Sequence, residues 1–178
     1  MNILFYGTVA ILRVIAYIIG KTYEEVNIWG YCIIGPLLFY TLYMLLTILL
    51  TYKAFKVNTV IGKVLTLLSL LFGVYIMFKF PSVHYISTHI YPIYDNCVEY
   101  MYKIGGSHTL GAYVNANVWT LVIIGPLLFM LLTGASTINV CTLTEKIKSW
   151  QLNTGIGILF ISAIAMLYGI NILKTLLY

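Results

Sequence analysis

The sequence predicts an all-α integral membrane protein with four core transmembrane helices, arranged as two parallel two-helix repeats, after an N-terminal hydrophobic helix. Only 8% of the 178 residues are charged and 61% are hydrophobic, whereas a soluble domain carries about a quarter charged residues. The windows 26–52 and 104–144 contain no Asp, Glu, Lys or Arg, and each exceeds the roughly 20 residues that cross a bilayer as a helix. The heptamer IIGPLLF occurs twice, at 33–39 and 123–129.

The N-terminal hydrophobic helix is expected within residues 1–20, with Arg13 near its middle. A charge at the bilayer centre costs about 3 kcal/mol or more unless it is paired or reaches the interface. Small and polar residues recur at spacings of three and four, which places them on one helical stripe: Asn2, Tyr6, Ala10, Arg13, Tyr17 and Gly20. Two arrangements satisfy this stripe. The helix spans the membrane with Arg13 turned into the bundle, or it lies flat in the interface.

Two repeats are expected at residues 27–79 and 117–174. The first begins NIWGYCIIGPLLF at Asn27 and the second NVWTLVIIGPLLF at Asn117, and the pattern Asn-Thr-x-Ile-Gly recurs at Asn58 and Asn153. Polar residues and Gly-Pro in the same order indicate duplication of a two-helix unit, because apolar composition alone does not reproduce them. Two membrane crossings separate each residue from its counterpart, so the repeats are parallel and related by a pseudo-twofold axis along the membrane normal.

The whole chain, residues 1–178, is expected to form a single membrane domain. Helices are expected rather than strands, because a helix satisfies its own backbone groups in lipid. Residues 80–116 are expected to form an outer loop, with a short amphipathic helix between Ile93 and Ile104. The four core helices are expected at about 28–52, 57–78, 118–143 and 152–173.

The positions of the basic residues predict the orientation. Lys53 and Lys56 follow the second hydrophobic segment, and Lys146 and Lys148 follow the fourth. Because short loops rich in Lys and Arg stay in the cytoplasm, these two links are expected inside and the loop 80–116 outside. The C-terminus is then outside, and the N-terminus is cytoplasmic if the first helix spans. We expect the bacterial inner membrane as the location.

The two Gly-Pro pairs are candidate structural kinks. Gly35 and Pro36 stand in the first copy, and Gly125 and Pro126 in the second. Proline has no backbone N–H, so each pair is expected to free a carbonyl one turn earlier and to bend its helix. Such a bend serves either a hinge beside a central path or ordinary packing.

Small and polar residues in the second repeat are candidates for a polar path or for helix packing, since membrane helices approach through small residues and bond through Ser, Thr and Asn. The candidate path comprises Arg13, Thr133, Ser136, Thr137 and Asn139. A close-packing face is expected on the last helix at Gly155, Ser162, Ala165 and Gly169.

The cysteines and histidines predict no metal site, and we expect no cofactor. The three cysteines form no C-x-x-C pair, and Cys32 and Cys97 would form a disulfide only if both face an oxidising compartment. Otherwise they are buried thiols. The histidines are not spaced as ligands on one helical face: they are His84, His89 and His108.

The expected partners are the lipid bilayer and either further copies of the chain or other membrane subunits. Nucleic acid is not expected, because the basic residues are spread singly along the chain and form no patch. No catalytic motif is present in the sequence, so we expect no enzymatic activity.

Three classes of function remain open. The first is a homo-oligomeric channel or transport-like protein, because few short helices enclose little volume and closed symmetry is the usual way to build a path. The second is a non-enzymatic membrane partner, namely an accessory subunit, an immunity or exclusion protein, or a membrane sensor of a defence system. The third is an enzyme acting on lipid or quinone, although no set of residues in the sequence supports this class.

Overall fold

A computed structural model describes residues 2–142 and 149–177, and these residues are helical with no strand among them. The all-α class is therefore confirmed. Lys146 and Lys148, on which part of the predicted orientation rests, lie outside the described residues. The chain divides into two compact units: unit 1 comprises Met1–Pro36, Pro81–Leu127 and Ile172–Tyr178, and unit 2 comprises Leu37–Phe80 and Leu128–Asn171.

Five helical runs within the described residues are long and apolar enough to cross a membrane. They are Asn2–Ile19, Tyr23–Val57, Val60–Thr88, Leu110–Cys141 and Trp150–Leu177. The second and fourth runs begin five or more residues before the expected starts at 28 and 118. Thr22 and Thr109 explain these earlier starts, because each hydroxyl accepts a hydrogen bond from a backbone N–H of the first helical turn.

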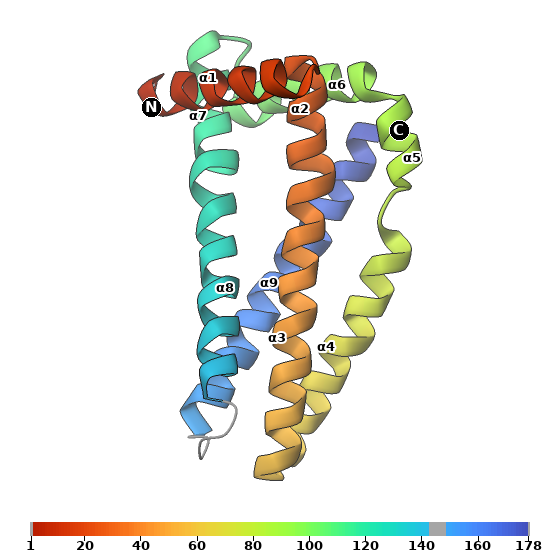
Figure 1. Cartoon of the computed structure of the whole chain (residues 1–178), viewed down its shortest axis with the longest axis vertical. Coiled ribbons are helices and arrows are strands. Elements are labelled where there is room, and N and C mark those ends of the chain that lie inside the picture. The colour runs from red at the N-terminus through yellow and green to blue at the C-terminus, as the bar shows by residue number, and fades with distance from the viewer. Residues whose placement is uncertain (1, 143–148, 178) are drawn as a thin grey trace. The chain divides into compact units, whose positions relative to one another are not determined.

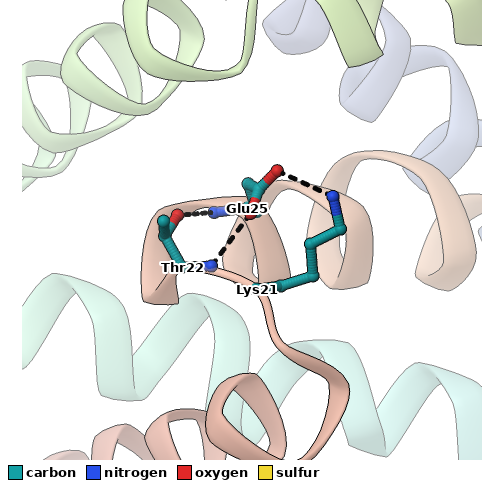
Figure 2. Close-up of polar contacts among 3 residues, drawn as sticks. All are labelled: Lys21, Thr22 and Glu25. Carbon is teal, nitrogen blue, oxygen red and sulfur yellow. Dashed lines mark hydrogen bonds and ion pairs between the residues drawn. The ribbon is translucent and has the colours of Figure 1, made fainter.

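A sharp corner separates α1 (Asn2–Ile19) from α2 (Tyr23–Ile28) in unit 1. Gly20 has φ of +68°, the left-handed conformation that commonly ends a helix. A capping box then starts α2 (Figure 2): the Glu25 N–H donates to Thr22 Oγ1 at 3.2 Å, and the Thr22 N–H donates to Glu25 Oε2 at 2.9 Å. Lys21 Nζ also lies 3.1 Å from Glu25 Oε1. The corner turns α1 away from the direction of α2.

Helix α1 lies across α7 (Leu110–Asn117) within unit 1 (Figure 1). Its inner stripe is apolar: Phe5, Val9 and Leu12 are half-buried and Ala16 is buried. Arg13 is exposed, and its guanidinium lies 5.8 Å from the centre of the Tyr23 ring. The structure thus places Arg13 outside the packed interior, in contrast to the expectation for a spanning helix with Arg13 turned inward.

Both copies carry a π-helical turn immediately before the Gly-Pro pair. These segments are η1 (Trp29–Ile34) and η2 (Val118–Ile124). The Gly35 N–H donates to the Gly30 carbonyl, and the Gly125 N–H donates to the Thr120 carbonyl, each five residues earlier. The missing N–H of Pro36 and Pro126 is therefore accommodated by wide turns, a feature that the expectation of a simple proline kink did not include.

Unit 1 also contains α5 (Val83–Thr88) and α6 (Ile90–Gly105), which precede α7 in the chain. The segment 80–116 is thus mostly helical, and α6 contains the amphipathic stretch expected between Ile93 and Ile104. Side chains of this region bind the C-terminal carbonyls of α9 (Ser149–Leu177). Asn96 Nδ2 donates to the Leu176 carbonyl at 2.8 Å, and the Tyr85 hydroxyl donates to the Leu177 carbonyl at 3.3 Å. These bonds satisfy acceptors that a helix end leaves open.

Unit 2 is a helix bundle made from α3 (Gly35–Val57), α4 (Val60–Lys79), α8 (Gly125–Cys141) and most of α9 (Figure 1). Its core is filled by fully buried side chains, among them Tyr43, Leu46, Leu50, Leu132 and Leu159. The Tyr43 hydroxyl donates to the Ser69 carbonyl at 3.1 Å, so the polar end of this buried ring has an acceptor.

The Asn-Thr motifs of the two copies have different structures. Asn58 has φ of +59° and separates α3 from α4, a left-handed position that Asn tolerates better than most residues. Asn153 instead lies inside α9, which begins at Ser149. The second helices of the two expected repeats therefore begin differently, although the first helices share the π-helical turn and the Gly-Pro pair.

The residues of the expected close-packing face of α9 differ in their exposure. Gly155 and Ser162 are buried, whereas Ala165 is half-buried and Gly169 is exposed. A Cβ at Gly155 would lie 2.8 Å from both terminal carbons of Leu50, so α3 and α9 approach closely there. Gly169 lies outside this face because the buried positions continue at Met166, Ile170 and Leu173.

A glycine substitution tests the packing of α6 against α7. A Cβ at Gly105 would lie 2.6 Å from the backbone oxygen of Ala112, and backbone cannot move as a side chain does. We expect Gly105→Ala to lower the free energy of unfolding by roughly 1–3 kcal/mol, measured by thermal or denaturant unfolding in detergent. Gly111→Ala is the control, since nothing lies within 4 Å of its Cβ position. Equal stability of the two variants would contradict this packing.

Candidate functional site

A small polar cavity lies within unit 1, between α1, α2, η1, α7 and η2. Its volume is about 30 Å³, which holds about one water molecule. Several apolar side chains form part of the wall, including Phe5, Leu12 and Leu121. The polar part of the wall comes from Thr8, Tyr23, Asn27, Tyr31, Tyr113 and Asn117.

Two matching Tyr–Asn pairs contribute to this cavity. The side chains of Tyr23 and Asn27 are hydrogen bonded, and so are those of Tyr113 and Asn117. Asn117 Nδ2 also donates to the Tyr113 carbonyl at 2.9 Å. Each tyrosine stands four residues before the asparagine that opens its repeat. The two Tyr–Asn pairs were not predicted from the sequence. Comparing the two copies four residues further toward the N-terminus would have shown them.

An aromatic shell surrounds the tyrosines of the cavity. The Tyr94 ring of α6 meets the Tyr23 ring edge-on at 6.2 Å, and the Tyr102 ring lies 5.0 Å from that of Tyr113. Burial raises the pKa of Tyr94 above its ordinary value. The Tyr94 hydroxyl therefore stays protonated at neutral pH.

The residues lining the cavity define what it can do chemically. Hydroxyl and amide groups supply both donors and acceptors, but the wall contains no carboxylate, imidazole, amine or thiol. Such a wall can hydrogen-bond a water molecule from several sides.

The candidate polar path on α8 is divided between two faces of the helix. Ser136 and Asn139 are buried inside unit 2, whereas Thr133 and Thr137 are exposed beside Gly134. The exposed residues line an open groove together with Phe129, Met130 and Ile138. The Thr133 and Thr137 hydroxyls donate to carbonyls of their own helix at 2.8 and 2.9 Å. The candidates for a polar path or for helix packing on α8 are therefore placed on two sides of the helix.

Lys53 is buried within unit 2 and does not lie in an inter-helix link as expected. Helix α3 continues to Val57, so Lys53 lies inside it with 0% of its surface exposed. Its Nζ donates to Asn139 Oδ1 at 2.9 Å and to Thr142 Oγ1 at 2.7 Å. These bonds join the C-terminal parts of α3 and α8, and they explain why Asn139 faces inward.

Two of the three histidines, His89 and His108, make ring contacts within unit 1. His89 stacks on Tyr85 at 4.3 Å, and His108 stacks on Tyr102 at 5.4 Å between ring centres. Within the ranges 2–142 and 149–177, no group of three or more His, Cys, Asp or Glu residues is placed to hold a metal ion.

Comparison with known proteins gives no further guide to the site. No protein-family model, curated protein or solved structure matches the chain.

The Lys53 contact is tested by removing its partner on α8. Asn139→Leu deletes an acceptor of a buried amine, and we expect the free energy of unfolding to fall by about 1–3 kcal/mol. Thr137→Leu is the matched control, because Thr137 is exposed on the same helix and its hydroxyl serves only its own backbone. Unfolding in detergent measures both variants. A loss of stability for Thr137→Leu as large as that for Asn139→Leu would contradict the assignment.

Proposed function

We propose that the chain is an integral membrane protein with four spanning helices and that α1 lies in the membrane interface. The surface supports membrane insertion, since large apolar side chains are exposed on every long helix, for example Ile61, Leu71, Phe160 and Ile161. The crosswise placement of α1 on α7 and the exposure of Arg13 support the interfacial position. The N-termini of α2 and α7 then lie on the outer side.

The protein acts as a homo-oligomer in which neighbouring copies meet along α8, with a channel or transport path between them. The outward face of α8 carries this proposal. Thr133, Gly134 and Thr137 interrupt an otherwise lipid-compatible surface, and membrane helices use such small residues to approach one another. A path between copies is favoured over one inside a copy, because the core of unit 2 is filled by buried side chains.

A second candidate is a non-enzymatic membrane partner, in which the same face of α8 binds a helix of another protein. One observation favours it: the hydroxyls of Thr133 and Thr137 are already satisfied within α8. This face therefore needs no water beside it and packs against a foreign helix as well as against its own copy.

One glycine substitution tests the oligomer. Gly134 and Gly157 both lie on exposed helix faces, with nothing within 4 Å of the Cβ position. Leucine at either site improves helix propensity by up to about 1 kcal/mol, so both variants should fold. We expect Gly134→Leu to shift the protein from oligomer to monomer by light scattering in detergent, whereas Gly157→Leu leaves the oligomer intact.

Ion flux separates the two candidate functions. Purified protein in liposomes should conduct potassium or chloride, and Gly134→Leu should abolish most of the flux while Gly157→Leu retains it. An oligomer without flux would refute the channel. A monomer that purifies with a second membrane protein in fixed ratio would favour the accessory role.

The orientation is tested by labelling single cysteines in a variant without the three native cysteines. Lys56 is the site for the cysteine on the inner side, because Lys56 is exposed at the end of α3 whereas Lys53 is buried. In intact cells, an impermeant thiol reagent should label a cysteine at His108 but not one at Lys56. After lysis both should react. Labelling of Lys56→Cys in intact cells would reverse the proposed orientation.

A further inference from the structure

Two of the three cysteines meet inside unit 1, although they are far apart in the sequence. The thiols of Cys32 on η1 and Cys97 on α6 are hydrogen-bond partners. Cys32 is buried and Cys97 is half-buried. Cys141 lies on α8 in unit 2 and is exposed, so it takes no part in this contact.

The packing of α6 against the first repeat brings the two thiols together. Ile90 and Ile93 are buried on one face of α6, and Cys97 follows Ile93 by one helical turn on the same face. The ring contact between Tyr23 and Tyr94 joins α2 to α6 along this face. Amphipathic packing therefore directs Cys97 toward η1.

We propose that Cys32 and Cys97 form a disulfide bond that fastens α6 to η1 in the mature protein. This inference rests on the orientation proposed above, which places both residues on the oxidising side of the membrane. The oxidant is a protein dithiol oxidase in its disulfide form. One thiol attacks that disulfide to give a mixed disulfide, and the other thiol displaces the oxidase sulfur. The Cys32–Cys97 bond forms, both thiol protons leave, and the oxidase is reduced to its dithiol.

The environment of the two thiols assigns their order of reaction. Cys97 is the more accessible residue and meets the oxidase first, whereas the buried Cys32 resolves the mixed disulfide.

The bond would fix the wide turn that precedes the first Gly-Pro pair. Cys32 lies within η1 beside Tyr31, a residue of the cavity wall. The second copy has Val122 at the corresponding position, so only the first π-helical turn is held in this way. The valine also supplies a conservative replacement for Cys32.

Counting free thiols in the full-length protein tests the proposal. Membranes are prepared with the thiols protected by acid, then denatured and treated with a maleimide of high mass, with or without prior reduction. We expect one labelled thiol, Cys141, in the unreduced wild-type protein and three after reduction. Mass spectrometry of the unreduced protein should yield a cross-linked peptide pair containing Cys32 and Cys97.

Variants separate the disulfide from mere inaccessibility of the thiols. Cys32→Val should leave Cys97 free and give two labels with or without reduction. Cys97→Ser should do the same for Cys32, and Cys141→Ser should give no label until reduction. Three labels in the unreduced wild-type protein would overturn the inference. If His108→Cys still labels from outside in that case, the orientation survives and only the disulfide is refuted.

Discussion

The missing backbone donor at Pro36 and Pro126 is the constraint around which the long helices are built. In an apolar surrounding every backbone group must find a partner within the protein, so a proline inside a helix needs local compensation. Here it comes from the π-helical turns η1 and η2, in which the glycine before each proline donates five residues back. The helices continue through the Gly-Pro pairs instead of ending there.

The helical segments just before these wide turns supply the polar wall of the cavity. They present Tyr23 and Asn27, and Tyr113 and Asn117, to one shared cavity. In each segment the tyrosine and the asparagine are four residues apart, so regular helical spacing places both on one face. What the spacing does not show is that the two faces lie against each other.

The sequence contained the helical class, the hydrophobic runs and the amphipathic pattern of α6, because these depend on composition and on regular spacing. It also indicated the division of the polar residues on α8. At the regular helical angle per residue, the pair Thr133 and Thr137 points about 110° away from the pair Ser136 and Asn139, so the two pairs face different sides of the helix. The inward position of Lys53 could not be predicted, because a lysine near a helix end is ordinarily solvated and only its partners on α8 show otherwise.

The two copies differ where the tertiary contacts differ, which gives the proposed duplication a physical logic. The first copy holds Cys32 against α6 and places Asn58 at a left-handed turn. The second has Val122 and a helical Asn153, and its α8 alone carries the outward Thr133, Gly134 and Thr137. What both retain is the wide turn and the tyrosine–asparagine pair beside it. Interior packing therefore constrains the shared features, whereas the first copy contacts α6 and the second carries the α8 face for which we propose a partner.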